Sequence, residues 1–262
     1  MSPTLRRRLD LELVHRRLVN NRTEAQDAID AGRVVVGGVP EPKSSTRVDG
    51  SASIRITSPP GRFVSRGGDK LAGALRELDV PVRDRRALDA GASTGGFTDC
   101  LLQEGAASVA AVDVGYGQLD WSLRNDPRVT VFERLNLRHA DVDDLGGPFD
   151  LIVADLSFIS ICTVAPRLVT LASQACDLIL LVKPQFEVGK GQVGKGGIVR
   201  DPEKHRAALL RVIECLADEG LGTMAVTASP IKGTKGNREF FVWARKGART
   251  VQDEDVDRVI GL

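Results

Sequence analysis

Seven short apolar runs alternate with longer amphipathic segments over the last two thirds of the chain. Runs of this length, bounded by turn residues, predict buried strands, and they cover residues 86–90, 108–113, 129–132, 150–154, 177–182, 222–229 and 239–244. Apolar residues at helical spacing fill most of the intervals, for example 98–104, 159–173 and 203–219. Asp201 and Pro202 form the cap and first-turn pair that begins the last of these helices. Strands that alternate with helices predict an α/β domain with a mostly parallel sheet covered on both faces.

The last two runs are joined by a turn-rich segment, residues 230–237, instead of a helix. A short connection of this kind returns the chain in the opposite direction, because parallel neighbours need a longer crossover. We therefore expect the seventh strand to lie antiparallel beside the sixth.

The first 57 residues follow a different pattern. Apolar residues at helical spacing predict one helix over residues 5–17 and a second helix that Thr23 caps and Gly32 ends. Short extended segments follow at 33–40, 43–48 and 53–56. Two helices and several short strands predict a small α+β domain. Residues 58–64 contain two prolines and a glycine, so we expect them to form a linker.

Charge is distributed unevenly along the 262 residues, which suffice for one α/β domain and a small extra domain. The net charge is only +1, but residues 1–62 carry 11 Lys and Arg against 7 Asp and Glu, whereas the remainder carries 25 against 28. A basic first domain on a near-neutral body fits either a polyanion-binding arm or a basic face that is merely solvated.

The cysteines and the apolar stretches indicate the compartment in which we expect the protein. Cys100, Cys162, Cys176 and Cys215 form no CxxC pair and lie in apolar stretches, as is typical of buried thiols in a reducing compartment. No apolar stretch approaches the roughly 18 residues of a membrane-spanning helix, and the arginine-rich start lacks the apolar core of a signal peptide. We expect a cytoplasmic protein with no membrane partner and no metal site.

The first strand of the body leads into a glycine-rich turn, residues 89–96 with the sequence DAGASTGG. Glycines at such a turn let the backbone approach a ligand closely. Asp113 at the end of the second strand could accept both ribose hydroxyls, and Asn136 after the third could meet an adenine edge. The expected cofactor contacts are these two residues with Gly91, Ala92, Ser93, Thr94, Gly95, Gly96 and Phe97. NAD, FAD and S-adenosylmethionine enzymes all use such an arrangement.

Four charged residues are expected at the same edge of the sheet. Asp155 and Lys183 end the fourth and fifth strands, and Glu239 begins the antiparallel strand, whose start lies at the carboxyl ends of the others. Lys70 is on a helix that precedes the first strand and can fold over this edge. Lys183 or Glu239 alone would most often be a surface ion pair. Together they suit the transfer of a methyl group to a sugar hydroxyl.

Longer motifs resemble the TlyA family, also called the hemolysin A type. The matching residues are 88–97, 113–119, 123–129, 155–160 and 182–194. The first domain is similar to S4-type RNA-binding domains at residues 8–10, 21–25, 29–38, 48 and 53–54. The resemblance implies an S4-like domain over 1–57, a linker over 58–64, an FtsJ-like methyltransferase domain over 65–247 and a variable tail over 248–262.

The resemblance also implies a Rossmann-like fold with a seven-stranded sheet, S-adenosylmethionine as cofactor and ribose 2′-O-methylation of cytidines in ribosomal RNA. The partners would be the 30S subunit, the 50S subunit or both. The family's Lys-Asp-Lys-Glu tetrad falls on Lys70, Asp155, Lys183 and Glu239. Asp155 would lie nearest the transferred methyl group and therefore also contact the cofactor.

The chemistry assigns a role to each member of the tetrad. A 2′-hydroxyl must share its proton as it attacks, and Lys183 is the expected base if burial or a second ammonium leaves a neutral fraction. Asp155 would orient Lys183 or the hydroxyl, Lys70 would stabilise the developing alkoxide, and Glu239 would hold one lysine. The division of roles between the two lysines stays open.

Arginine and lysine side chains outside the tetrad are expected to contact RNA phosphates. Those in the first domain are Arg6, Arg7, Arg8, Arg22 and Arg33, and those in the body are Arg66, Lys190 and Lys195. The last two lie in a glycine-rich loop, residues 189–197, which we expect to close on RNA.

Three other functions compete with a methyltransferase. The glycine spacing GxxxGG differs from the GxGxxG of NAD-dependent oxidoreductases. A membrane-active hemolysin would need spanning helices or repeated hairpins. A non-catalytic, RNA-binding ribosome assembly factor with an unused cleft is disfavoured only by the complete tetrad. The target subunit, the oligomeric state and any ordering of Arg62 and Phe63 by RNA stay open.

Overall fold

The computed structural model describes residues 6–19, 21–30, 32–57, 62–189, 191–233 and 235–262. The chain divides into two compact units, Met1–Gly61 and Arg62–Leu262. Each is described by itself.

The first unit contains two helices and short strands, as the pattern predicts. Its elements are β1 (Arg7–Arg8), α1 (Leu9–His15), α2 (Arg22–Asp30), β2 (Val34–Val36), β3 (Val39–Pro40), β4 (Arg47–Val48) and β5 (Ile54–Ile56). Strands β3, β2 and β5 form an antiparallel sheet, and β1 pairs with β4. Leu9, Leu13 and Ile29 are buried between the helices and the strands. Helix α2 begins at Arg22, so Thr23 lies inside the helix and the expected cap at Thr23 is wrong.

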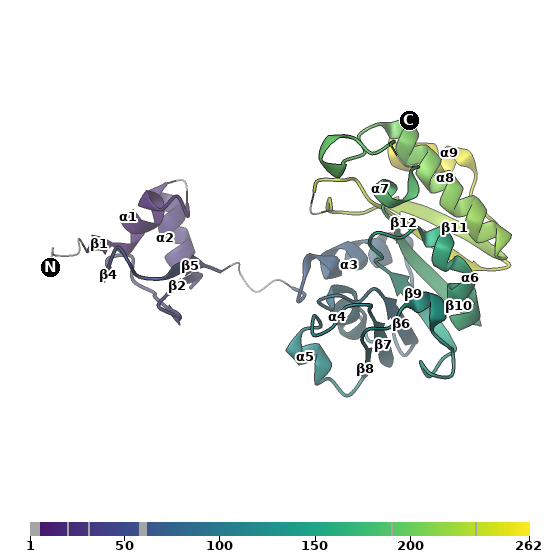
Figure 1. Ribbon diagram of the computed structural model, residues 1–262, viewed down its shortest axis with the longest axis horizontal. Coiled ribbons are helices and arrows are strands. Elements are labelled where there is room, and N and C mark those ends of the chain that lie inside the picture. The colour runs from purple at the N-terminus through teal and green to yellow at the C-terminus, as the bar shows by residue number, and fades with distance from the viewer. Residues whose placement is uncertain (1–5, 20, 31, 58–61, 190, 234) are drawn as a thin grey trace. The chain divides into compact units, whose positions relative to one another are not determined.

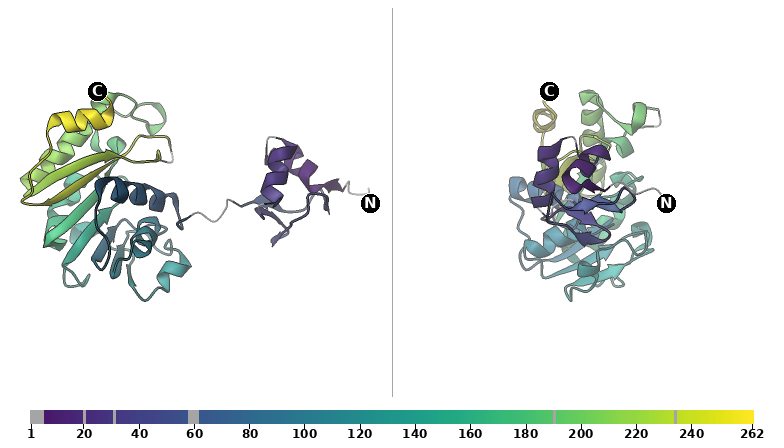
Figure 2. Two further views of the ribbon diagram at one scale, coloured as in Figure 1. Left: turned by 180° about the vertical axis from the view of Figure 1, so that it is seen from behind. Right: turned by 90° about the vertical axis from the view of Figure 1, so that its left-hand side faces the viewer.

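The second unit alternates strands and helices around one seven-stranded sheet. Its elements are α3 (Arg66–Leu78), β6 (Arg86–Ala90), α4 (Gly96–Gln103), β7 (Ser108–Val112), α5 (Trp121–Arg124), β8 (Val129–Phe132), β9 (Phe149–Ala154), α6 (Ile161–Leu171), β10 (Ala172–Val182), α7 (Pro184–Glu187), α8 (Pro202–Asp218), β11 (Leu221–Ala228), β12 (Phe240–Lys246) and α9 (Asp253–Ile260), with single 3₁₀ turns at Leu137–His139 and Lys195–Gly197. Helices cover both faces of the sheet, with α3 and α4 on one face and α6 and α8 on the other (Figures 1 and 2).

The order of the strands is β11-β12-β10-β9-β6-β7-β8. The pairs from β10 to β8 are parallel, whereas β12 is antiparallel to both β10 and β11. The expected mostly parallel sheet and the antiparallel return of the last strand are confirmed. Strand β12 inserts between β10 and β11, so its first residue lies at the edge where β6, β9 and β10 end.

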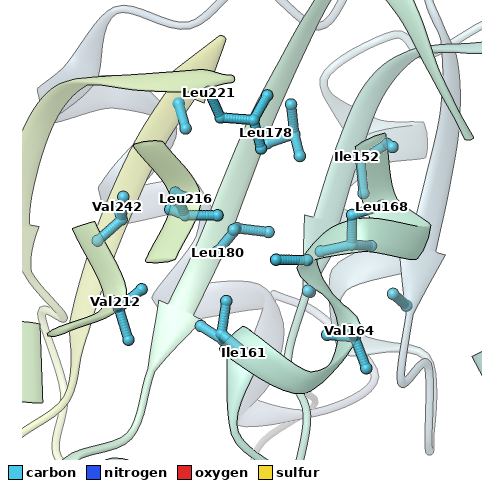
Figure 3. Packing of buried hydrophobic residues seen from close by; sticks show 14 of the residues in the cluster. Ile152, Ile161, Val164, Leu168, Leu178, Leu180, Val212, Leu216, Leu221 and Val242 are labelled. Carbon is cyan, nitrogen blue, oxygen red and sulfur yellow. The ribbon is translucent and has the colours of Figure 1, made fainter. Parts of the chain in front are cut away.

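Alternation of apolar residues along the central strands builds the two faces of the core. In β10, Leu178 and Leu180 face α6 and α8, whereas Ile179 and Leu181 face α3 and α4. Figure 3 shows Leu178 and Leu180 packed with Leu168 of α6 and other residues of this cluster. Burial on both faces explains why these strands appear as continuous apolar runs instead of alternating ones.

Residues 248–262 belong to the second unit, although the sequence separated them as a variable tail. Val256 and Ile260 of α9 are buried against the same core as α8 and β11. The Arg206 guanidinium bonds Asp253 and Asp257, and the Arg238 guanidinium donates to the Val259 and Ile260 carbonyls. This helix was not predicted because most of its residues are charged and only a few apolar residues show the helical spacing.

Candidate active site

The glycine-rich turn joins β6 to α4 at the point where the sheet order reverses. Gly91 and Gly95 have φ values of +88° and +96°, in the region that favours glycine. A Cβ on Gly91 would lie 2.9 Å from the Asp155 carbonyl oxygen, and one on Gly95 would lie 2.3 Å from the Leu123 side chain. Both positions therefore require glycine. The turn can then present bare backbone to a ligand.

A cavity of about 750 Å³ opens beside this turn. Its size is that of a small-molecule or nucleotide site. Residues 91–94, Gly96 and Phe97 form one wall, and Lys70, Asp155, Lys183 and Glu239 also line the cavity. The structure thus brings together the four charged residues that come from α3, β9, β10 and the start of β12.

The four charged residues form two separate ion pairs. Lys70 Nζ lies 2.6 Å from Glu239 Oε2, and Lys183 Nζ lies 2.5 Å from Asp155 Oδ1. Lys183 Nζ also donates a hydrogen bond to Ser157 Oγ at 2.9 Å. Lys70, Lys183 and Glu239 are buried, whereas the Asp155 side chain is 23% exposed. Each lysine therefore has its own carboxylate, and Asp155 connects its pair to solvent.

A glycine makes room for the Glu239 carboxylate. The segment between β11 and β12 passes so close to Glu239 that a Cβ on Gly233 would lie 2.2 Å from Glu239 Oε1. Asn237 holds the same segment, because its side chain accepts a hydrogen bond from Val199 N–H and donates one to the Gly197 carbonyl. Neither residue was identified from the sequence, where 230–237 is only a turn.

A buried carboxyl group lies beneath the glycine turn. Asp89 in β6 is fully buried and accepts a hydrogen bond from Thr98 Oγ1 at 2.7 Å. The pKa of Asp89 is raised to about 7, mainly because the carboxyl group is buried; the charges of Asp155 and Asp113 also raise it, and the hydrogen bond from Thr98 lowers it.

We expect the Asp89→Asn variant to lose less stability than the unmodified protein as pH rises from about 5 to about 8. The folded-state pKa of Asp89 lies above the unfolded value, so the folded protein retains a proton that the unfolded chain has released. Its contribution to stability is therefore present at low pH and is lost as pH rises through about 7. Asparagine does not titrate. Urea unfolding across this range measures the effect, and parallel pH profiles of the two proteins would contradict it.

Three of the expected cofactor contacts, Gly95, Asp113 and Asn136, are not among the residues that line the cavity. The oxygens of Asp113 accept hydrogen bonds from the Ser93 and Gly115 backbone N–H groups at 2.8 and 2.6 Å. Asn136 is exposed, and its side chain accepts a hydrogen bond from Arg138 N–H. The structure therefore has Asp113 ordering the glycine turn and Asn136 beginning a 3₁₀ turn.

Three of the expected RNA-binding arginines are paired inside the first unit. Arg7 bonds Glu12 at 2.7 Å, and both Arg8 and Arg22 bond Asp10, at 3.0 and 2.9 Å. The hydrogen bond from Arg8 holds the pKa of Asp10 below its usual value. These pairs fix the orientation of the guanidinium groups and offset part of their charge.

The other expected RNA contacts differ in their surroundings. Arg6 is exposed and Arg33 is half-buried. Arg66 is exposed at the first turn of α3, lines the cavity and donates to the Lys232 carbonyl at 2.8 Å. Lys190 lies outside the described residues, and the side chain of Lys195 is not described either.

An aromatic side chain at the rim of the cavity was missed from the sequence. Phe158 is 89% exposed and has a φ of +65°, which is unusual for a bulky residue. Its ring centroid lies 5.2 Å from that of Phe186, and both residues line the cavity. The signal was present, because Phe158 follows Asp155 by three residues, but an apolar residue after a strand usually belongs to the core.

Among the residues that the structure describes, no helix combines the length and apolarity needed to cross a membrane.

Comparison with known proteins follows the division into two units. A family model described as FtsJ-like methyltransferase matches residues 63–246, and an S4 domain model matches residues 7–54. The chain is 52% identical to the 16S/23S rRNA (cytidine-2′-O)-methyltransferase TlyA of Mycobacterium tuberculosis over 92% of this chain and 90% of that relative. It is 41% identical to Hemolysin A of Brachyspira hyodysenteriae over 89% of this chain and 98% of that relative. A solved structure of a candidate hemolysin from Streptococcus thermophilus matches with a TM-score of 0.75 and 36% identity, covering 98% of this chain and 94% of the other.

Proposed function

Because the chain belongs to the TlyA family of FtsJ-like methyltransferases that carry an N-terminal S4 domain, we propose that it methylates the ribose 2′-hydroxyl of cytidine in ribosomal RNA. The observation that carries the proposal is the pair of lysine–carboxylate contacts in one cavity beside the glycine turn. A hydroxyl nucleophile needs a proton acceptor and a nearby positive charge, and this arrangement supplies both.

The glycine turn supports S-adenosylmethionine as the cofactor. Residues 91–94, Gly96 and Phe97 line the cavity. The turn keeps this shape because a side chain at Gly91 or Gly95 would collide with neighbouring protein atoms. Asp155, which follows β9, lines the same cavity. We place the cofactor against these residues, with Asp113 holding the backbone of the turn at Ser93. When bound, S-adenosylmethionine supplies an electrophilic methyl group on a positively charged sulfur.

Lys183 and Asp155 act as one unit in removing the proton of the 2′-hydroxyl. Lys183 must be neutral to accept that proton, so its own proton first leaves to Asp155, its ion-pair partner, or to solvent. The Lys183 amine then accepts the hydroxyl proton as the oxygen attacks. Asp155 is the more exposed partner and returns the extra proton to solvent. Ser157 fixes the direction of the Lys183 side chain through the hydrogen bond that it accepts.

Lys70 stabilises charge and does not transfer protons. Its ammonium lines the cavity and is held by Glu239, so it adds a fixed positive charge near the negative oxygen. Gly233 and Asn237 keep Glu239 and its segment in place. The rate enhancement otherwise comes from holding the hydroxyl in line with the methyl group.

We expect Phe158→Ala to lower kcat/KM for RNA by roughly tenfold to hundredfold. The exposed ring offers a stacking surface for a nucleobase, and loss of one stacked base costs about 1–3 kcal/mol. Steady-state methylation at varied RNA concentration measures the change, and binding of S-adenosylmethionine serves as an internal control. Phe158→Tyr keeps an aromatic face and should keep most of the activity. Equal activity of the alanine and tyrosine variants would contradict stacking.

The function is tested by transfer of tritium from labelled S-adenosylmethionine to purified 30S and 50S subunits. We expect label in ribosomal RNA of one or both subunits with the unmodified protein and none with Lys183→Ala. Bound cofactor without label in either subunit would instead support an RNA-binding assembly factor. Leakage of liposomes caused by the pure protein would revive the hemolysin alternative.

A further inference from the structure

We infer that Lys232 and Lys235, together with Arg66, form a binding site for phosphate groups of the RNA strand that presents the target ribose. This inference rests on the proposed function and extends it to residues of the segment between β11 and β12, which the sequence indicates only as a turn.

The site lies directly over the Lys70–Glu239 pair. Lys232 and Lys235 lie on either side of Gly233 in the segment between β11 and β12. Because Gly233 has no side chain, its backbone packs against the Glu239 carboxylate. Both lysines are exposed and line the cavity. The Arg66 guanidinium donates to the Lys232 carbonyl and so ties the first turn of α3 to this segment.

The charges of the cavity are not balanced by the described residues. Its described lining includes five cations, namely Arg66, Lys70, Lys183, Lys232 and Lys235, and two carboxylates, namely Asp155 and Glu239. The carboxylates are paired with Lys70 and Lys183. Arg66, Lys232 and Lys235 form no ion pair with a described residue, so a charge of about +3 remains.

The cofactor does not balance this charge, because S-adenosylmethionine carries a sulfonium and an ammonium against one carboxylate. RNA does, because the ribose carbon adjacent to the one that bears the 2′-hydroxyl carries the 3′-phosphodiester of the same nucleotide. Delivery of that hydroxyl to Lys183 therefore brings phosphates to the rim of the cavity. Arg66 offers further N–H donors to such a group, and lysines act as mobile point charges.

Lys235 lies close to a second segment that lines the cavity. Its Nζ lies 3.9 Å from the position that a Cβ on Gly197 would take, so the side chain extends between its own segment and the 3₁₀ turn Lys195–Gly197. Asn237 fastens these two segments together. A strand of RNA that enters the cavity passes this point, and Lys235 is placed to contact its backbone.

The test is a double variant, Lys232→Gln with Lys235→Gln. The control double variant, Arg76→Gln with Arg83→Gln, removes the same charge from exposed positions that do not line the cavity. We expect the lysine variant to raise KM for RNA roughly tenfold at moderate salt. We also expect the slope of log affinity against log salt to become less steep by about 1.4, because each phosphate contact on a single strand contributes about 0.7.

Replacement of both lysines by arginine should restore the salt slope, because the charge is kept. Unchanged RNA affinity and slope in the glutamine variant would overturn the site. A rise in KM for S-adenosylmethionine instead of RNA would assign the lysines to the cofactor. An equal loss of RNA affinity in the control variant, Arg76→Gln with Arg83→Gln, would show that the effect comes from overall charge and not from this site. Filter binding of RNA requires no turnover, so failure of this site and failure of methyl transfer are distinguished.

Discussion

Lys183→Met is expected to lower methyl transfer by about 10²–10⁴-fold while cofactor binding is kept. Methionine has nearly the shape of lysine, so it fills the same space but can neither accept a proton nor pair with Asp155. The loss should appear in kcat with saturating RNA and cofactor. Single-turnover methylation measures the chemical step, and calorimetry with S-adenosylmethionine verifies that the pocket is intact.

Arginine at the two lysine positions separates proton transfer from charge. Arginine keeps the positive charge and can still bond the carboxylate, but it does not lose its proton in proteins. We therefore expect Lys183→Arg to be nearly as inactive as Lys183→Met, whereas Lys70→Arg beside Glu239 should retain substantial turnover. The reverse order would make Lys70 the base. Substantial activity of both arginine variants would remove lysine as a base altogether.

Gly91→Ala is expected to abolish cofactor binding and to destabilise the second unit. A positive φ costs an alanine of the order of 1–2 kcal/mol. The added Cβ would also lie 2.9 Å from the Asp155 carbonyl oxygen. That backbone cannot move away easily, because Asp155 N–H donates to the Ala90 carbonyl. Any relaxation would displace Asp155 and the turn together. Calorimetric titration with S-adenosylmethionine and urea unfolding measure the two effects.

Gly220→Ala is the matched control for Gly91→Ala. Gly220 has a φ of +76° between α8 and β11, and nothing lies within 4 Å of an added Cβ. It therefore introduces the same backbone strain without the collision. We expect Gly220→Ala to lose stability but to bind the cofactor normally. Equal cofactor affinity of the two variants would show that the Gly91 turn does not form the cofactor site.

The arrangement of the sheet could be predicted because each determinant is local or short-range. Runs such as Leu178–Leu181 are apolar at every position, which occurs when a strand is buried on both faces. The missing helix before Phe240 predicts the reversal of β12. Once the strand ends were placed, Asp155, Lys183 and Glu239 had to meet at one edge.

Side-chain pairing could not be predicted in the same way. The sequence does not determine that Lys70 bonds Glu239 while Lys183 bonds Asp155, because both lysines reach the cavity from different elements. Asp113 follows its strand as expected, but the backbone N–H groups of Ser93, in the glycine-rich turn, and of Gly115 bond its two oxygens. The same holds for Asp10 and Glu12 in the first unit, which bond arginines that otherwise look free.

The remaining site residues were not identified from the sequence because their exposure differs from what their residue types usually indicate. Phe158 is an aromatic residue that the structure leaves at the surface, and hydrophobic pattern alone assigns such residues to the core. Lys232 and Lys235 lie in a segment of turn residues, where charge is usually solvated. The position of these lysines at the cavity follows from the tertiary structure, because β12 inserts between β10 and β11 and the preceding segment then lies at the cavity.

The central claim, transfer of a methyl group to a ribose oxygen, is tested most directly by mass spectrometry of nucleosides from ribosomal subunits that were incubated with the protein and S-adenosylmethionine. The account predicts 2′-O-methylcytidine, absent when Lys183→Met replaces the unmodified protein. Cytidine methylated on the base, or a modified nucleoside other than cytidine, would contradict it.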